Sequence, residues 1–87
     1  MVMMDSEKIE AIIRSNLPDC TVSVEGDGRH FEAKIISDVF EGLSLLARQR
    51  KVYSFLSTYI QQGTIHALSL ATKTYHESKQ EREYNNG

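Results

Sequence analysis

Residues 20–36 read CTVSVEGDGRHFEAKII, in which two strand-like patterns flank a glycine-rich turn. Three β-branched residues favour a strand over residues 20–25. The turn sequence GDG at residues 26–28 is typical of a tight hairpin, because glycine adopts positive φ without steric cost. Apolar and polar side chains alternate in the return strand, residues 30–36, which is the pattern of a sheet with one buried face. The sequence therefore predicts an antiparallel hairpin.

Helical patterns lie on both sides of the hairpin. Residues 5–17 carry apolar side chains at helical spacing, with Asp5 or Ser6 as the N-cap. Pro18 ends this helix, because its ring disfavours helical geometry in the residue before it. Residues 43–62 form a longer helical region, in which a break near residues 49–51 would produce two helices.

The last third of the chain predicts a strand and a short helix. Gly63 suits a left-handed residue just past a helix end. A third strand is expected over residues 64–71, with His66 at its start. Thr74 and Glu77 have the spacing of a capping box, which opens a final helix reaching to about residue 83.

This order of elements predicts an α+β fold, a two-layer sandwich in which helices cover one face of a three-stranded sheet. Residues 1–83 are expected to form a single domain, and residues 84–87 a disordered tail. The core of such a small domain is thin, so function is expected on an edge, a loop or a partner surface.

Composition narrows the classes of protein. The formal net charge of −2 argues mildly against a free-standing nucleic-acid binder, which usually needs a basic surface. Cys20 is the only cysteine, so no internal disulfide forms. No apolar stretch approaches the roughly 20 residues that span a bilayer, and the N-terminus lacks a signal-peptide pattern. A cytoplasmic protein is expected.

Two histidines are candidate metal ligands. His66 lies where the chain leaves a turn and enters the third strand, so a neutral imidazole there is within reach of a metal in solvent. His30 and Asp27 would join it at one end of the sheet if the second and third strands are neighbours. The alternative is that both histidines are ordinary polar residues at strand starts, and His76 is expected to be a surface residue.

Catalytic signals are absent from the sequence. Cys20 has no CxxC partner and is interpreted as a small buried hydrophobe. There is no G-x-S-x-G elbow or phosphate-binding loop, so no enzyme is predicted. The cluster Arg48, Arg50 and Lys51 fits a DNA-recognition helix, a solvated helix face, or a contact with an acidic protein or with glutathione.

Together these residues resemble the BolA family. Phe40-Glu41-Gly42 and residues 48–53 are similar to its F-x-G and R-H-R-x-V-Y signature, with Gln49 in place of the histidine. Residues 65–68, IHAL, resemble its motif of His-Ala between apolar residues. With the hairpin included, the similarity spans about residues 5–77, and the short form is most similar to the acid-stress-associated IbaG or YrbA branch.

The resemblance implies an αββααβα fold similar to class II KH domains. It also implies a heterodimer with a monothiol glutaredoxin, bridged by a [2Fe–2S] cluster, with a role in cluster trafficking or in iron or stress signalling. His66 matches the family's cluster ligand. Many relatives supply a second Cys or His from the hairpin loop, where this chain has no cysteine and His30 is the nearest candidate. Alone, the chain is expected to be a monomer or weak dimer.

Two alternative functions remain open: a DNA-binding regulator, and a scaffold without a metal that recruits other proteins through its open sheet face or a strand edge. In the first, the helix that carries Arg48, Arg50 and Lys51 would belong to a DNA-binding stress-response regulator. KH-like topology also suggests RNA binding, but the chain lacks the G-x-x-G loop that clamps an RNA backbone.

Overall fold

The computed structural model describes the backbone of residues 4–86 and the side chains of residues 4–82. The elements in chain order are α1 (Ser6–Asn16), β1 (Thr21–Gly26), β2 (His30–Ile36), the 3-10 helix η1 (Asp38–Phe40), α2 (Leu45–Gln61), β3 (Ala67–Lys73) and α3 (Tyr75–Asn86). This order confirms the α+β class and the αββααβα succession, with η1 as the first of the two consecutive helices.

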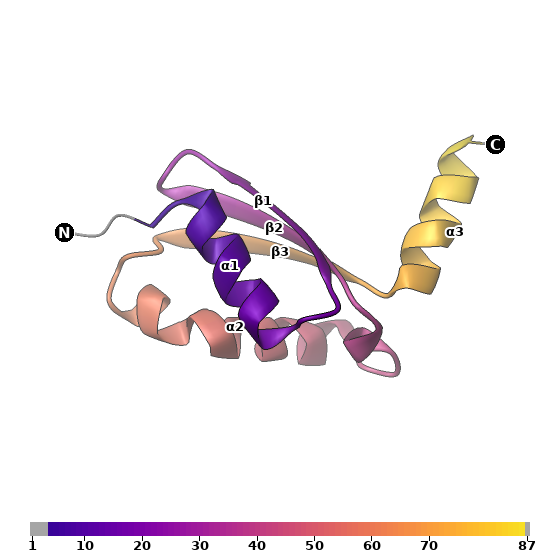
Figure 1. Ribbon diagram of the computed structural model, residues 1–87, viewed down its shortest axis with the longest axis horizontal. Helices are drawn as coiled ribbons and strands as arrows, with labels where there is room; N and C mark the ends of the chain where they lie inside the picture. Colours follow the sequence, from indigo (N-terminus) through magenta and orange to yellow (C-terminus); the bar gives the residue numbers. More distant parts are fainter. Residues whose placement is uncertain (1–3, 87) are drawn as a thin grey trace.

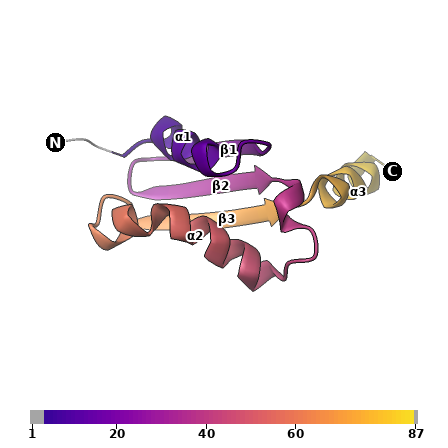
Figure 2. The ribbon, with the colours of Figure 1, turned by 60° about the horizontal axis from the view of Figure 1, so that its bottom comes forward.

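The sheet has the strand order β1-β2-β3. β1 and β2 pair antiparallel as the predicted hairpin, and β2 and β3 pair parallel. In Figure 1, α1 and α2 lie on the same face of the sheet, as predicted. α3 differs, because it stands beyond the far end of the strands and does not cover that face. Figure 2 shows α2 in front of β3, which it crosses obliquely.

The core lies between this sheet face and the two covering helices. The strands place alternate residues on it, because successive side chains of a strand point to opposite faces. Its buried apolar side chains are Met4, Ile9, Ile13, Leu17, Val22, Val24, Phe31, Ala33, Ile35, Phe40, Val52, Leu56 and Ile65. None of the described side chains of α3 is buried, so that helix is held by polar contacts.

Side-chain caps begin α1 and α2, and that of α1 is the predicted Asp5. The Asp5 carboxylate accepts a hydrogen bond from the Lys8 backbone N–H at 2.9 Å, which caps α1. Ser44 caps α2 in the same way through the Ala47 N–H. α2 then runs unbroken to Gln61, so no break forms near residues 49–51. Gly63, with a φ of 77°, ends it as expected.

The third strand is shifted from its predicted range, residues 64–71, to Ala67–Lys73. The backbone N–H groups of Thr64 and Ile65 both donate to the Tyr59 carbonyl, at 2.9 and 3.1 Å. These two residues therefore complete the end of α2 and do not join the sheet. His66 consequently precedes the strand by one residue.

The C-terminal helix is longer than predicted. It extends to Asn86, whereas the sequence suggested an end near residue 83 and a disordered tail over residues 84–87. The backbone of residues 84–86 is thus helical, and residues 1–3 and 87 lie outside the described part of the chain. No helix among the described residues is long and apolar enough to cross a membrane.

Candidate functional site

His66 lies at the end of the sheet where the parallel strands β2 and β3 begin. The Ala67 N–H donates to the Arg29 carbonyl at 3.1 Å, which is the first hydrogen bond of the β2–β3 ladder. His66 therefore lies one residue outside the hydrogen-bonded sheet. Its side chain is exposed, and no described residue forms a hydrogen bond or ion pair with it. The imidazole is free to meet a ligand or a partner protein.

The residue before His66 fixes its position. Ile65 is 1% exposed and packs in the core, at the point where the chain leaves α2. The chain thus enters the sheet with a buried anchor on one side of His66 and a paired strand residue on the other. This arrangement places an exposed histidine on a well-fixed backbone.

His30 lies at the same end of the sheet, as predicted. Because β2 and β3 run parallel, both strands begin there, and His30 pairs in register with Ala67. The His30 side chain is 77% exposed, and its Nδ1 lies 3.9 Å from the Asp27 Oδ2. The strand pairing therefore brings the two candidate ligands, His30 and His66, to the same end of the sheet.

Asp27 serves the hairpin turn. Its Oδ1 accepts hydrogen bonds from the backbone N–H groups of Arg29 and His30, both at 2.9 Å. These donors, that of His30 first, lower the pKa of the Asp27 carboxyl. Among the described residues, no three His, Cys, Asp or Glu side chains gather in a way that could hold a metal ion. Within the described part of the chain, this end of the sheet presents two imidazoles, those of His30 and His66, and no complete metal site.

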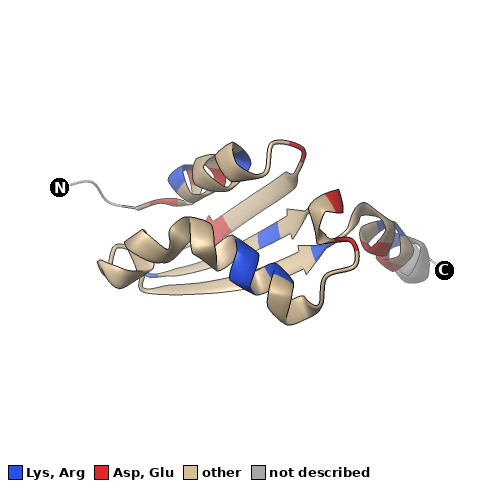
Figure 3. Cartoon of the chain, turned by 90° about the horizontal axis from the view of Figure 1, so that it is seen from below, with Lys and Arg blue, Asp and Glu red and all other residues tan. Residues whose placement is uncertain are grey.

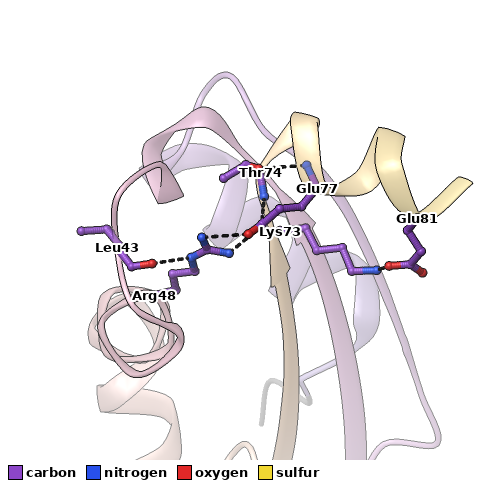
Figure 4. Close-up of polar contacts among 6 residues, drawn as sticks. All are labelled: Leu43, Arg48, Lys73, Thr74, Glu77 and Glu81. Carbon is purple, nitrogen blue, oxygen red and sulfur yellow. Dashed lines mark hydrogen bonds and ion pairs between the residues drawn. The ribbon is translucent and has the colours of Figure 1, made fainter. Parts of the chain in front are cut away.

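The predicted basic cluster is divided. Arg48 points into the molecule: its side chain is 11% exposed, and its guanidinium lies 5.9 Å from the centre of the Phe40 ring. Its Nε donates to the Leu43 carbonyl at 3.0 Å (Figure 4). Arg50 and Lys51 are exposed. In Figure 3 the basic residues of α2 lie in its N-terminal half. Only two of the three residues predicted to contact nucleic acid are thus accessible on α2.

Glu77 is the partner that sequence reasoning missed. The Arg48 guanidinium donates to both of its carboxylate oxygens, and the Thr74 backbone N–H donates to Oε1 at 2.8 Å (Figure 4). The Glu77 N–H donates in return to the Thr74 hydroxyl at 3.1 Å, which confirms the capping box. The hydrogen bonds from Arg48 and then Thr74 lower the pKa of Glu77 from 4.5 to about 2. Glu77 therefore remains charged at neutral pH.

Cys20 shows no sign of a reactive thiol. It is partly buried beside the core, and burial raises the pKa of its thiol. The thiol form predominates at neutral pH, and a thiol is a poor nucleophile and a poor metal ligand compared with a thiolate. The structure brings no described histidine into hydrogen-bonding contact with it.

The structure is that of a small α+β domain with an exposed histidine just before its third strand. Residues 3–77 match the family model described as BolA-like protein. The acid stress protein IbaG of Escherichia coli K12 is 33% identical over 82 residues, which cover 94% of this chain and 98% of IbaG. The chain belongs to the BolA-like family.

Solved structures agree. A BolA homologue from Coxiella burnetii is 42% identical, with a TM-score of 0.79 over 88% of this chain and 99% of its own. A Bol-like protein from Babesia bovis is 32% identical, and the two structures superpose with a TM-score of 0.80. The match covers 93% of this chain and 96% of the Babesia protein. The match to IbaG over nearly the full length of both chains supports the predicted likeness to the IbaG-type branch.

Proposed function

We propose that this protein is a cytoplasmic, non-enzymatic adaptor that pairs with a monothiol glutaredoxin through a shared [2Fe–2S] cluster. Membership of the BolA-like family gives the proposal its starting point. The observation that carries it is the exposed His66 imidazole, one residue outside the sheet and without a hydrogen bond or ion pair to any described residue. Cluster trafficking, or iron or stress signalling, would be the role of such a pair.

The residues of this chain suit a shared cluster better than one held by the chain alone. His66 supplies one imidazole and His30, at the same end of the sheet, can supply a second. The partner would provide the thiolates, from a cysteine and from glutathione. A bound cluster of this kind supplies electron-transfer or cluster-donation chemistry, and imidazole ligands raise its potential relative to thiolates.

Anaerobic reconstitution tests the proposal. The chain is mixed with a monothiol glutaredoxin, glutathione, ferrous iron and sulfide, and visible circular dichroism and size-exclusion chromatography follow the heterodimer. The mixture is expected to give a cluster spectrum different from that of the glutaredoxin alone. His66→Ala should abolish the difference, because the iron loses its imidazole ligand.

The matched control is His76→Ala, which removes an exposed histidine from α3, beyond the other end of the sheet. It should leave the spectrum and the heterodimer unchanged. A cluster spectrum that is the same in the His66→Ala variant as in the original chain would contradict the ligand assignment.

DNA binding is the less supported alternative. Arg50 and Lys51 remain exposed on α2 and provide two of the three predicted contacts, while Arg48 is engaged with Glu77. A DNA-binding helix would give affinity that falls steeply with salt and drops with Arg50→Ala. Binding to a promoter fragment no tighter than to random duplex would remove the case for a regulator.

A further inference from the structure

The β3 strand leaves one backbone edge open. It is the last strand of the sheet and pairs only with β2. The Ala67 N–H and the Lys73 carbonyl both bond toward the β2 side of the strand, to Arg29 and Ser37. Because backbone groups alternate in direction along a strand, those of Leu68, Leu70 and Thr72 point away from β2.

These outward groups have almost no partners. The Leu68 carbonyl accepts a hydrogen bond from the Tyr53 hydroxyl at 2.9 Å. No other described residue bonds to the outward N–H and C=O groups of Leu68, Leu70 and Thr72. An unpaired edge of this kind is a template for another extended chain.

The edge also lacks the features that usually block such pairing. Natural edge strands are protected by charged residues, proline or β-bulges. Residues 67–72 read ALSLAT, without a charge or a proline. The register with β2 is continuous from Ala67 to Lys73, so no bulge twists the strand away. Apart from the Leu68 carbonyl, the strand is thus free to accept a neighbour as far as Lys73, the charged residue at its end.

One side of α2 borders this edge. Leu46, Tyr53 and Ile60 recur every seven residues, which places them on one side of the helix. Tyr53 turns that side toward β3 through its bond to Leu68. Leu46 is 57% exposed and Ile60 37% exposed. In Figures 2 and 3, α2 crosses β3 obliquely, and its N-terminal half extends past the edge of the sheet.

We infer that this surface binds an extended peptide segment of a partner protein, which adds to the sheet beside β3. The β3 edge surface consists of the open backbone of residues 68–72 and the α2 side chains Leu46, Gln49 and Tyr53. Strand addition satisfies the backbone groups, and alternate side chains of the peptide reach the adjoining side of α2. The proposal does not depend on the cluster at His66.

The charges around the surface define the peptide further. The β3 edge surface itself carries no charged side chain, which suits apolar or small residues at alternate positions. Arg50 lies one helical turn before Tyr53, is exposed, and forms no ion pair with a described residue. Arg48 and Lys73 are already paired with Glu77 and Glu81. A carboxylate at one end of the peptide would therefore meet Arg50.

A lone peptide strand fits better than the other occupants. A second copy pairing through β3 would bring its own α2 into the space where the N-terminal half of this α2 already extends. A nucleic acid needs cations along its phosphates, and the centre of the β3 edge surface has none. Both remain distinguishable outcomes of the test.

The test selects peptides of about ten residues from a random displayed library on the full chain. Selected sequences should alternate apolar and small residues and carry Asp or Glu near one end. Nuclear magnetic resonance of the labelled chain with a synthetic selected peptide should show slower amide exchange at Leu70 and Thr72, by about tenfold or more. No enrichment, or exchange protection elsewhere, would overturn the inference.

Matched variants sharpen the result. Leu46→Glu should weaken peptide binding by about tenfold or more, while Val39→Glu, an exposed apolar residue of η1, should not. Arg50→Glu should weaken binding, and Lys51→Glu, with the same change of charge beside Phe55 on another side of α2, should have little effect. If Arg50→Glu and Lys51→Glu weakened binding equally and oligothymidine displaced the peptide, the surface would be a nucleic-acid site and the peptide inference would be contradicted. The inference would also be contradicted if the free chain eluted as a dimer and the peptide then protected no amide of β3 from exchange.

Discussion

The Arg48 guanidinium and the Glu77 carboxylate form two parallel hydrogen bonds, from Nη1 to Oε1 at 2.7 Å and from Nη2 to Oε2 at 3.2 Å. This fork-to-fork geometry joins the start of α2 to the start of α3 across 29 residues of sequence. The same carboxylate caps α3 through the Thr74 N–H. Arg48 therefore acts in this molecule as a structural residue that fixes the base of α3.

Replacing Arg48 should destabilise the fold more than replacing Arg50. Arg48→Ala removes the bonds to Glu77 and Leu43, whereas the Arg50 side chain is exposed and bonds to no described residue. We expect Arg48→Ala to lower the melting temperature by roughly 4 to 8 °C, and Arg50→Ala to leave it nearly unchanged. Calorimetry on the two variants checks this. Equal melting temperatures would mean that the contact contributes nothing to stability.

Acid should weaken the Arg48–Glu77 contact. The pKa of Glu77 is lowered to about 2 in the folded chain, against 4.5 ordinarily. A carboxyl with a depressed folded pKa stabilises the fold above its unfolded pKa, and this contribution is lost as the pH falls from about 4.5 toward 2. Urea unfolding should therefore show the original chain well above Glu77→Gln at pH 7, with the gap closing toward pH 2.5. A gap that stays constant with pH would contradict the assignment.

Two buried threonines should respond in opposite directions to valine. The Thr72 hydroxyl is buried without a hydrogen-bond partner among the described residues, so Thr72→Val should raise the free energy of unfolding by about 1 kcal/mol. The Thr74 hydroxyl accepts the Glu77 N–H, so Thr74→Val should lower it by about 1 kcal/mol. Denaturant titration of both variants measures the difference. A loss of stability in Thr72→Val would show that its hydroxyl has a partner.

The two hairpin glycines should differ in their tolerance of alanine. A Cβ at Gly26 would overlap the Phe31 ring and the His30 carbonyl oxygen, whereas a Cβ at Gly28 would meet no atom within 4 Å. Gly28 has a φ of 97°, so alanine there costs only backbone strain, about 1–2 kcal/mol. Gly26→Ala should cost more, about 2–3 kcal/mol, and shift the resonances of the hairpin. The opposite ranking in urea unfolding would contradict this account.

Replacing His30 should impair a shared cluster less than replacing His66. His30 holds one ring nitrogen near Asp27 and has its other side exposed, so His30→Ala should shorten the lifetime of the visible band without preventing assembly. Asp27→Asn keeps an acceptor for the turn and should leave the band unchanged. The check is the rate at which the visible absorption decays under anaerobic conditions, measured for the original chain, His30→Ala and Asp27→Asn. A His30→Ala variant indistinguishable from the original would place the second ligand outside this chain.

Local patterns predicted most of the elements. The hairpin, the caps at Asp5 and Thr74, and the end at Gly63 depend on interactions within a few residues, which sequence spacing reveals. Gly26 illustrates the limit of such reasoning. The GDG turn suggested positive φ at both glycines, but Gly26 is needed because Phe31 packs against its backbone.

Contacts between distant segments were beyond the sequence pattern. Nothing in the spacing of Arg48 and Glu77 indicates their bond, so the sequence pattern places Arg48 in one basic cluster with Arg50 and Lys51. The start of β3 depended on Tyr59 accepting from Thr64 and Ile65. By contrast, the expectation that His30 and His66 share one end of the sheet required only that β2 and β3 be neighbours, and this is confirmed.

The placement of α1 and α3 toward opposite ends of the sheet affects how the protein can be handled. α3 leaves the sheet at the end remote from the start of β3, whereas α1 begins on the side where β3 starts (Figure 1). An affinity tag or fluorophore fused behind α3 therefore stands far from His66. The same fusion placed ahead of α1 would crowd the histidine end and obstruct the docking of any protein there. Fusions behind α3 are thus the ones suited to capturing a partner that docks at His66.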